Sequence, residues 1–390
     1  MRGPARLVRL DRTGLLFLLL FCNTFGVGAF GPLLPEIGRS QSLPDWQLGL
    51  VVSAFGFARM ISALPVGVLA GRWLAGTLMA APLVLIVGLA LLVSAGPLPV
   101  LLVGRFVLGV SHTLTMVGGL TAILLEARRA NASVRLNVFE FAGMLGILGG
   151  LALVAVIPAA WGWKASLVIA AGPALIPLLM IPAMRRTFPD APAPARAATP
   201  EAGEGVSLRR QGSGVVALMF GVGILFALTW SSVSGFVVPV RGTREFGLTR
   251  TGISWLLGMA QAIDLAALIP MGRLADRVGH GLILGTSSIM LGLGALGVGM
   301  GSFPLFAIGC ACLGLGLAGW MLPLGVIREH TSVGRLAWRT GLYRVGVDSA
   351  IFMGPLAAGI VGAGGETAFL VVVGGAALAL GARLMWRQVR

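Results

Sequence analysis

The sequence predicts an all-α membrane protein in which 12 transmembrane helices form two pseudo-symmetric six-helix bundles. Hydrophobic residues make up 57% of the 390 positions, charged residues make up only 11%, and the mean hydropathy is +0.94. These values exclude an ordinary soluble surface. Apolar runs of about 20 residues, the length that crosses a bilayer core of about 30 Å as a helix, also follow one another along the chain.

Short charged or Gly/Pro-containing breaks separate these runs. Each run is read as a helix, because unpaired backbone groups are too costly in hydrocarbon for an open sheet and the strands of a membrane barrel are much shorter. The predicted helices of the first half cover residues 14–35, 46–69, 77–95, 100–125, 135–158 and 165–184. Those of the second half cover residues 213–237, 250–270, 282–300, 304–326, 340–362 and 367–386.

The formal net charge of +15 is read as a signal of membrane orientation rather than of nucleic-acid binding, because the basic residues gather on one side. With the N-terminus inside, 21 of the 29 Lys and Arg residues fall in cytoplasmic breaks. The outer breaks hold five, namely Arg39, Lys164, Arg241, Arg244 and Arg250. This asymmetry predicts a multi-pass protein of the bacterial inner membrane with both termini in the cytoplasm. The first run is too long for a signal peptide and is read as a retained helix.

An internal repeat predicts the domain organisation. The segment "PVGVLAGR" at residues 65–72 matches "PMGRLADR" at 270–277, and "GRFVLG" at 104–109 matches "GCACLG" at 309–314, both with an offset of 205. Two matches at one offset indicate duplicated six-helix units. We therefore expect an N-terminal bundle over residues 1–184, a Pro- and Ala-rich cytoplasmic linker over 185–212, and a C-terminal bundle over 213–390.

The segment "GRLADRVGHG", which begins at Gly272, resembles the loop signature of the major facilitator superfamily. The resemblance implies that Asp276 and Arg277 form a gating latch against a helix N-terminus of the opposite half, a contact type worth about 0.3–1 kcal/mol. The N-terminal counterpart has Gly71 where the signature has its Asp, so we expect an asymmetric latch.

Two further segments carry the same resemblance. "LLVGRFVLG" contains Arg105 and looks like the fourth-helix Arg motif of the superfamily, and "GLYRVGVDSAIFMGPLAAG" resembles an eleventh-helix pattern with Gly354 and Pro355. We expect Gly272, Gly354 and Pro355 to act in gating together with Asp276 and Arg277. The whole pattern is closest to the drug and sugar efflux branches. It departs from proton antiporters in the fifth helix, where "GMLGILGG" lacks their proline.

The scarcity of lysine argues against ATP as the energy source. Lys164, in "WGWKAS", is the only lysine, so the sequence contains no phosphate-binding loop of an ATP-driven pump. We expect no cofactor and no metal site, and we expect a proton gradient to drive the protein.

Ionisable residues inside the predicted helices are the main site candidates, because each costs roughly 2.5–3.5 kcal/mol to insert and so needs a partner or a wet cavity. They are Arg59, Arg105, His112, Glu140, Asp264, Arg344 and Asp348. Polar or aromatic cavity contacts are expected from Asn23, Trp230, Gln261 and Trp320.

Each charged candidate has a functional and a structural interpretation. Arg105 and His112 are seven residues apart and share one helix face. In the functional interpretation Arg105 binds an anion and His112 titrates, and in the structural one they form a packed hydrogen-bonding pair. Glu140 and Asp264 are proton carriers or partners of a neighbouring arginine. Arg344 and Asp348 are four residues apart and can pair with each other.

These residues favour a secondary transporter that works by alternating access on a small molecule, acts as a monomer, contacts lipid and binds no nucleic acid. Proton-coupled export of a small organic molecule is the first hypothesis. Proton-coupled uptake of a small organic anion is the second, because Arg59, Arg105 and His112 cluster in the N-terminal half. A membrane receptor or scaffold is the alternative from another class, whereas an enzyme is not expected because HExxH and GxSxG motifs are absent.

Overall fold

The computed structural model describes residues 11–94, 96–126, 132–188, 211–331 and 333–388. Every regular element within these ranges is helical, which confirms the predicted fold class. The first half consists of α1 (Arg12–Gln41), α2 (Asp45–Arg72), α3 (Leu74–Val93), α4 (Leu98–Glu126), α5 (Ala132–Val156), η1 (Ala159–Trp161), α6 (Gly162–Ala170), η2 (Gly172–Ala174), α7 (Leu175–Leu179) and α8 (Ile181–Thr187). The second half consists of α9 (Gln211–Thr229), η3 (Trp230–Val237), α10 (Val238–Phe246), α11 (Arg250–Val278), α12 (His280–Gly299), α13 (Phe303–Leu317), α14 (Leu322–Glu329) and α15 (Val333–Gln388).

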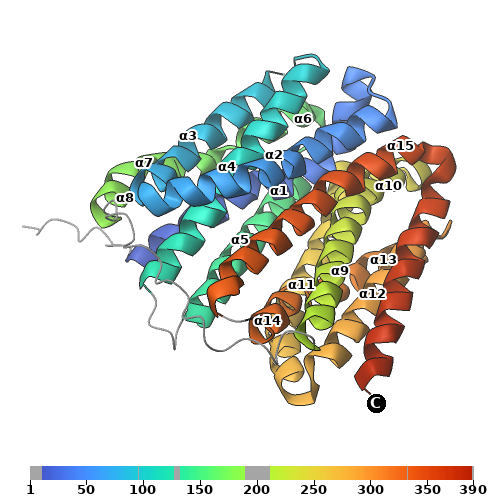
Figure 1. Ribbon diagram of the computed structural model, residues 1–390. Helices are drawn as coiled ribbons and strands as arrows, with labels where there is room; N and C mark the ends of the chain where they lie inside the picture. The colour runs from blue at the N-terminus through green and yellow to red at the C-terminus, as the bar shows by residue number, and fades with distance from the viewer. Residues whose placement is uncertain (1–10, 95, 127–131, 189–210, 332, 389–390) are drawn as a thin grey trace, which may run out of the picture.

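Eleven helices in the described ranges are long and apolar enough to cross a membrane. The last of these, Trp338–Trp386, turns back on itself at Gly362, whose φ of +63° suits a residue without a β-carbon. Figure 1 shows α15 rising to this turn and descending again to the C-terminus. The two helical segments of α15 that meet at Gly362 are the two crossings that the sequence predicts as residues 340–362 and 367–386.

Three predicted spans differ from the structure in their regularity or length. The sixth is divided into α6, η2, α7 and α8. Pro173, Pro177 and Pro182 lie within the first three residues of η2, α7 and α8, because proline lacks a backbone donor and interrupts the helical hydrogen bonds that precede it. The seventh contains the π-helix η3 and continues past residue 237 as α10. The eighth runs to Val278 rather than residue 270.

The predicted linker, residues 185–212, lies for the most part outside the described residues. The structure resolves its two edges, where α8 ends at Thr187 and α9 begins at Gln211.

Glycines bring helices of the first half into close contact. A β-carbon at Gly28 of α1 would collide with the Ile147 carbonyl of α5, and one at Gly146 or Gly150 of α5 would collide with carbonyls of α1. The Thr24 hydroxyl donates a 2.7 Å hydrogen bond to the Gly143 carbonyl across the same contact. Small residues thus allow the near approach expected of membrane helices.

The two halves meet most closely on one face of the molecule. We call the face that holds the start of α1 and the end of α15 the terminal face, and the opposite face, with the turns at Ser42 and Gly362, the far face. Toward the far face, a β-carbon at Gly56 of α2 would lie 2.6 Å from the Phe352 nitrogen of α15. A β-carbon at Gly359 of α15 would lie 3.0 Å from the Gly49 α-carbon of α2. These contacts position a cavity between the halves.

Candidate functional site

A cavity of about 470 Å³ lies between the two halves and is bordered by both. Its wall reaches toward the terminal face through Leu20, Gly67, Leu120 and Thr340. The structure brings eight of the sequence candidates to this wall, namely Arg59, His112, Glu140, Trp230, Gln261, Asp264, Trp320 and Arg344. The cavity is therefore the meeting point of the charges that the sequence places inside the membrane.

Asp348 pairs across the boundary between the halves. Its Oδ1 lies 2.6 Å from Nη2 of Arg59 on α2, whereas its Oδ2 lies 3.8 Å from Nε of Arg344 on its own helix. The pairing predicted from the four-residue spacing is present, but the partner in the first half is closer. Asp348 is buried, so this ion pair links α2 to α15 away from water.

Glu140 and Asp264 face the cavity from opposite halves. Glu140 lies within electrostatic range of Arg344 and Arg59. Asp264 is only 4% exposed, and its Oδ2 accepts a 3.0 Å hydrogen bond from Nε2 of Gln261. Its Oδ1 has no hydrogen-bond partner among the described residues. One interpretation of the sequence paired Glu140 or Asp264 with Arg105, but among the described residues the structure shows no ion pair between either of these carboxylates and Arg105.

His112 is held by a short chain of polar groups. Its Nδ1 lies 3.0 Å from Oδ1 of Asn23, and Nδ2 of Asn23 donates to Oγ of Ser111 at 2.9 Å. Ser111 in turn donates to the Ala81 carbonyl at 2.8 Å. Asn23 therefore supports His112 from behind and is not part of the cavity wall described by the structure.

Arg105 borders a smaller pocket of about 110 Å³ that adjoins the cavity. Its guanidinium carbon lies 4.0 Å from the Phe30 ring centroid and 5.0 Å from that of Phe55, and its Nε donates to the Val51 carbonyl at 3.4 Å. Its Nη1 has no hydrogen-bond partner among the described residues. Arg105 and His112 share a helix face but serve different spaces and are not bonded to each other in the structure.

Two indoles form part of the site. The rings of Trp230 and Trp320 lie 6.3 Å apart at an interplanar angle of 63°, and both border the cavity. Trp230 also borders the smaller pocket, at the start of the π-helix η3. A π-helix within a longer helix is frequent at functional sites, because its wider turn re-aims side chains.

The predicted gating residues lie in helices. Gly272, Asp276 and Arg277 belong to the last turns of α11, which corrects the prediction that Asp276 and Arg277 lie in a loop, because the helix continues to Val278. The Asp276 side chain is 76% exposed and lies 3.9 Å from Nε2 of His280, four residues along the chain.

The other two gating candidates lie on α15. A β-carbon at Gly354 would lie 2.5 Å from Oγ of Ser231 in η3, so α15 and η3 touch there within the second half. The Pro355 carbonyl faces the first half, because it would collide with a β-carbon at Gly49 of α2. Pro355 borders the smaller pocket.

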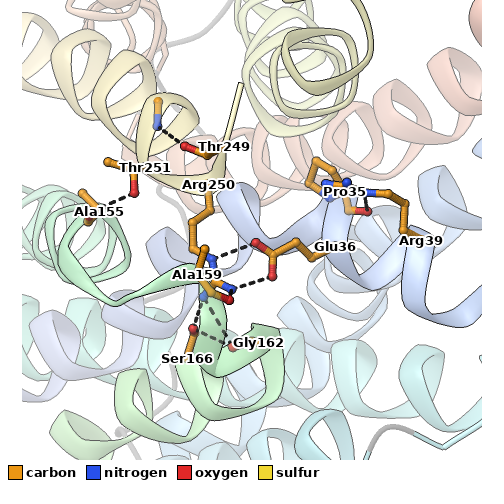
Figure 2. Close-up of polar contacts among 11 residues, drawn as sticks. Pro35, Glu36, Arg39, Ala155, Ala159, Gly162, Ser166, Thr249, Arg250 and Thr251 are labelled. Carbon is orange, nitrogen blue, oxygen red and sulfur yellow. Dashed lines mark hydrogen bonds and ion pairs between the residues drawn. The ribbon is translucent and has the colours of Figure 1, made fainter. Parts of the chain in front are cut away.

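An arginine clamp closes the far face (Figure 2). Arg250, at the start of α11, reaches Glu36 of α1 with both its Nε and its Nη2 at 2.7 Å from the two carboxylate oxygens. Nη2 also donates to the Ala159 carbonyl at 2.9 Å, and Nη1 donates to Ser166 and the Gly162 carbonyl. The Arg250 side chain is 0% exposed, so the guanidinium group of the clamp is shielded from solvent.

A second arginine bridge lies on the same face. Nη2 of Arg244 on α10 lies 2.7 Å from Oδ1 of Asp45 on α2, and its Nη1 lies 3.2 Å from Glu366 on α15. The far face is thus closed by ion pairs and by the glycine contacts of α2 and α15, whereas the cavity, as the described residues line it, extends toward the terminal face.

The model of the family described as Major Facilitator Superfamily matches residues 16–240 and again 219–390. The chain belongs to the Major Facilitator Superfamily. The motifs in "GRLADRVGHG" and "LLVGRFVLG" had predicted this family, and the match over the whole chain confirms it. The protein is therefore a multi-pass membrane transporter.

Solved structures of superfamily transporters share the fold. A peptide transporter POT in complex with alafosfalin has a TM-score of 0.80 at 13% identity, over 95% of this chain and 93% of that one. A POT family transporter in complex with 5-aminolevulinic acid has a TM-score of 0.82 at 12% identity, over 96% and 95%. The nucleoside transporter NupG has a TM-score of 0.72 at 14% identity, over 96% and 98%. No curated protein matches the chain.

Sequence reasoning missed the clamp of this superfamily member. Arg244 and Arg250 entered only as charges of an outer break, and Glu36, Asp45 and Glu366 were not singled out. The available signal was that these basic and acidic residues fall near the predicted outer ends of helices in both halves, where ion pairs between the halves can form.

Proposed function

We propose that this transporter exports a small organic molecule in exchange for protons by alternating access, as a monomer in the bacterial inner membrane with both termini in the cytoplasm. The observation that carries the proposal is the placement of Glu140 and Asp264 on opposite halves around one cavity. A carboxyl group in a membrane cavity can hold a proton or a cationic substrate, which allows the two to be exchanged. In this orientation the closed far face and the extension of the cavity toward the terminal face correspond to an inward-facing state.

The charges around the two spaces speak against an organic anion as the substrate. Three arginines, Arg59, Arg105 and Arg344, stand against three carboxyl groups, Asp348, Glu140 and Asp264. Arg59, which contributed to the anion hypothesis, is neutralised by Asp348 at 2.6 Å. A balanced site with indole walls favours an amphipathic molecule without net charge or with a cationic group.

Everted membrane vesicles with an acidified interior test the proposal. A library of small organic amines and zwitterions is added outside, and a pH-sensitive dye reports whether a compound releases protons from the vesicles. We expect at least one compound to do so with the natural protein. Glu140→Gln and Asp264→Asn should abolish the release, and Glu329→Gln, an exposed acidic residue at the end of α14, should preserve it.

Two other outcomes would favour the alternative hypotheses, namely uptake and a scaffold without transport. Accumulation of a labelled compound inside intact energised cells would replace export by uptake. If the triple variant Arg105→Gln, Glu140→Gln and Asp264→Asn kept the biological activity of the protein, a scaffold without transport would be favoured instead.

A further inference from the structure

We infer that the transported molecule is a zwitterion whose anionic group binds Arg105 in the smaller pocket and whose ammonium group binds Asp264 in the central cavity. This assignment rests on the proposed transport function and adds the substrate class to it. It follows from the unused hydrogen-bonding groups of two buried side chains in adjoining spaces.

Arg105 supplies the anion end. The Phe30 and Phe55 rings lie near its guanidinium group, its Nε is used by the Val51 carbonyl, and its Nη1 has no partner among the described residues. The side chain is 4% exposed and borders the pocket of about 110 Å³. A buried guanidinium group with an unpaired Nη1, on the wall of a largely apolar pocket, is suited to a carboxylate or another oxyanion.

Asp264 supplies the cation end. One carboxylate oxygen accepts from Gln261, and the other has no partner within the described ranges. The indoles of Trp230 and Trp320 border the same cavity, and aromatic faces attract an ammonium group. Oδ1 is covered in this structure, but Asp264 borders the cavity, and buried polar groups in proteins almost always have partners. We therefore assign the partner of this carboxylate to a ligand in the cavity.

The remaining charges around the cavity neutralise one another. Arg59 and Arg344 both lie near Asp348, and Glu140 lies within electrostatic range of the same two arginines, which gives two positive and two negative groups. Arg105 and Asp264 are left as the unmatched positive and negative charges of the site. A ligand with one charge would satisfy only one of them.

The two groups border adjoining spaces. The smaller pocket and the cavity share wall residues, among them Phe55, Trp230 and Gln261, and binding to both groups requires that one molecule extends from one space into the other. Arg105 lies on α4 of the first half and Asp264 on α11 of the second. A bound zwitterion would therefore bridge the halves, which is the geometry that couples binding to their relative movement.

Binding to the purified protein, without a pH gradient, tests this assignment. The probes are straight-chain ω-amino carboxylates of increasing length, from aminobutyrate to aminododecanoate, with alkylamines and alkyl carboxylates of the same lengths. Thermal stabilisation and quenching of tryptophan fluorescence report binding. We expect one length of amino carboxylate to bind about tenfold or more tightly than the matched amine and the matched carboxylate.

Variants assign each end of the ligand. Arg105→Gln should lower the affinity for the amino carboxylate to that of the amine and leave the amine unchanged, and Arg105→Lys should recover part of the loss. Asp264→Asn should lower the affinity to that of the carboxylate. Glu329→Gln should change nothing. Because the amine still binds to the Arg105→Gln protein, its affinity also shows that this variant is folded.

Three results would overturn the assignment: no amino carboxylate of any length binds, the matched amine binds equally well, or Arg105→Gln weakens the amine and the amino carboxylate alike. The vesicle experiment and the binding experiment can contradict the proposed export and the proposed substrate class separately. Proton release by compounds without a zwitterionic group would leave export intact and remove only the substrate class, whereas zwitterion binding without proton release would remove proton-coupled export.

Discussion

Arg250 of the second half and Glu36 of the first half form a two-pronged ion pair in which both nitrogen-to-oxygen distances are 2.7 Å. The same face also carries an ion pair between Arg241 and Glu245 that lies within α10 alone. The first pair joins the two halves and the other does not. Comparing variants of the two pairs therefore separates the effect of closing the far face from the effect of merely removing a charge there.

Glu36→Gln should open the far face, because it leaves the buried Arg250 guanidinium without its carboxylate, at a cost of about 2 kcal/mol or more. Spin labels at Trp161 and Met300, exposed positions on the far face of opposite halves, would measure the change as longer distances. Glu245→Gln should leave the distances unchanged, because its arginine partner lies on the same helix. Equal distances in the Glu36→Gln protein and the natural protein would contradict the clamp.

Asp45→Asn should open the far face less than Glu36→Gln does. The Arg244 side chain is 40% exposed, so water and salt already weaken its ion pair, and exposed pairs contribute about 1 kcal/mol or less. Its effect on the label distances should shrink further at high ionic strength. The prediction is wrong if Asp45→Asn equals or exceeds Glu36→Gln under the same conditions.

Gly56→Ala should destabilise the protein, because the new β-carbon would lie 2.6 Å from the Phe352 nitrogen, and overpacking of this kind costs about 1–3 kcal/mol. The thermal midpoint in detergent measures the effect. Gly71→Ala is the matched control on the same helix, because nothing lies within 4 Å of a β-carbon there. A similar midpoint for the two variants would show that the α2 and α15 contact does not require glycine.

Asp348→Asn should lower the thermal midpoint strongly, because it leaves Arg59 buried without its partner at 2.6 Å, and breaking a buried pair costs about 3–5 kcal/mol. The double variant Arg59→Gln and Asp348→Asn should recover part of this loss, because no unpaired charge remains at the two positions. If the double variant is as unstable as the sum of the single ones, the pair is not the source of the effect.

Asp276→Asn should slow transport without lowering expression or stability, because the carboxylate is 76% exposed in this far-face-closed state. The reason is the latch that the superfamily resemblance implies, which would engage when the terminal face closes. The rate of proton release from the vesicles, once a compound is found, measures the effect. Unchanged rates would show that Asp276 takes no part in closing the terminal face.

The sequence predicted the helices and the membrane-embedded charges because hydrophobic run length and the cost of buried charge are local properties. It predicted the pairing of Arg344 with Asp348, which depends on helical spacing alone. It did not predict that Arg59 lies closer to Asp348, because that contact depends on how two halves pack. The clamp of Arg250 was missed for the same reason, since both partners lie at helix ends that resemble ordinary loop boundaries.

The helix ends themselves were the other weakness. The prediction ended the eighth helix before Gly272 and so placed Asp276 in a loop. The helix continues through polar residues beyond its apolar run, and a prediction based on hydropathy does not detect such an extension. The prediction of two separate helices on either side of Gly362 was right, but the break between them is shorter than the predicted residues 363–366, because one glycine between apolar runs does not reveal how many residues leave the helix.

Arg250 gathers acceptors from three separate segments of the other half, namely Glu36, Ala159 and the start of α6, with a single side chain. When that side chain withdraws, all of these acceptors lose their donor in the same event. We therefore expect the far-face end of the transport path to be either closed or open, with partly open intermediates scarce.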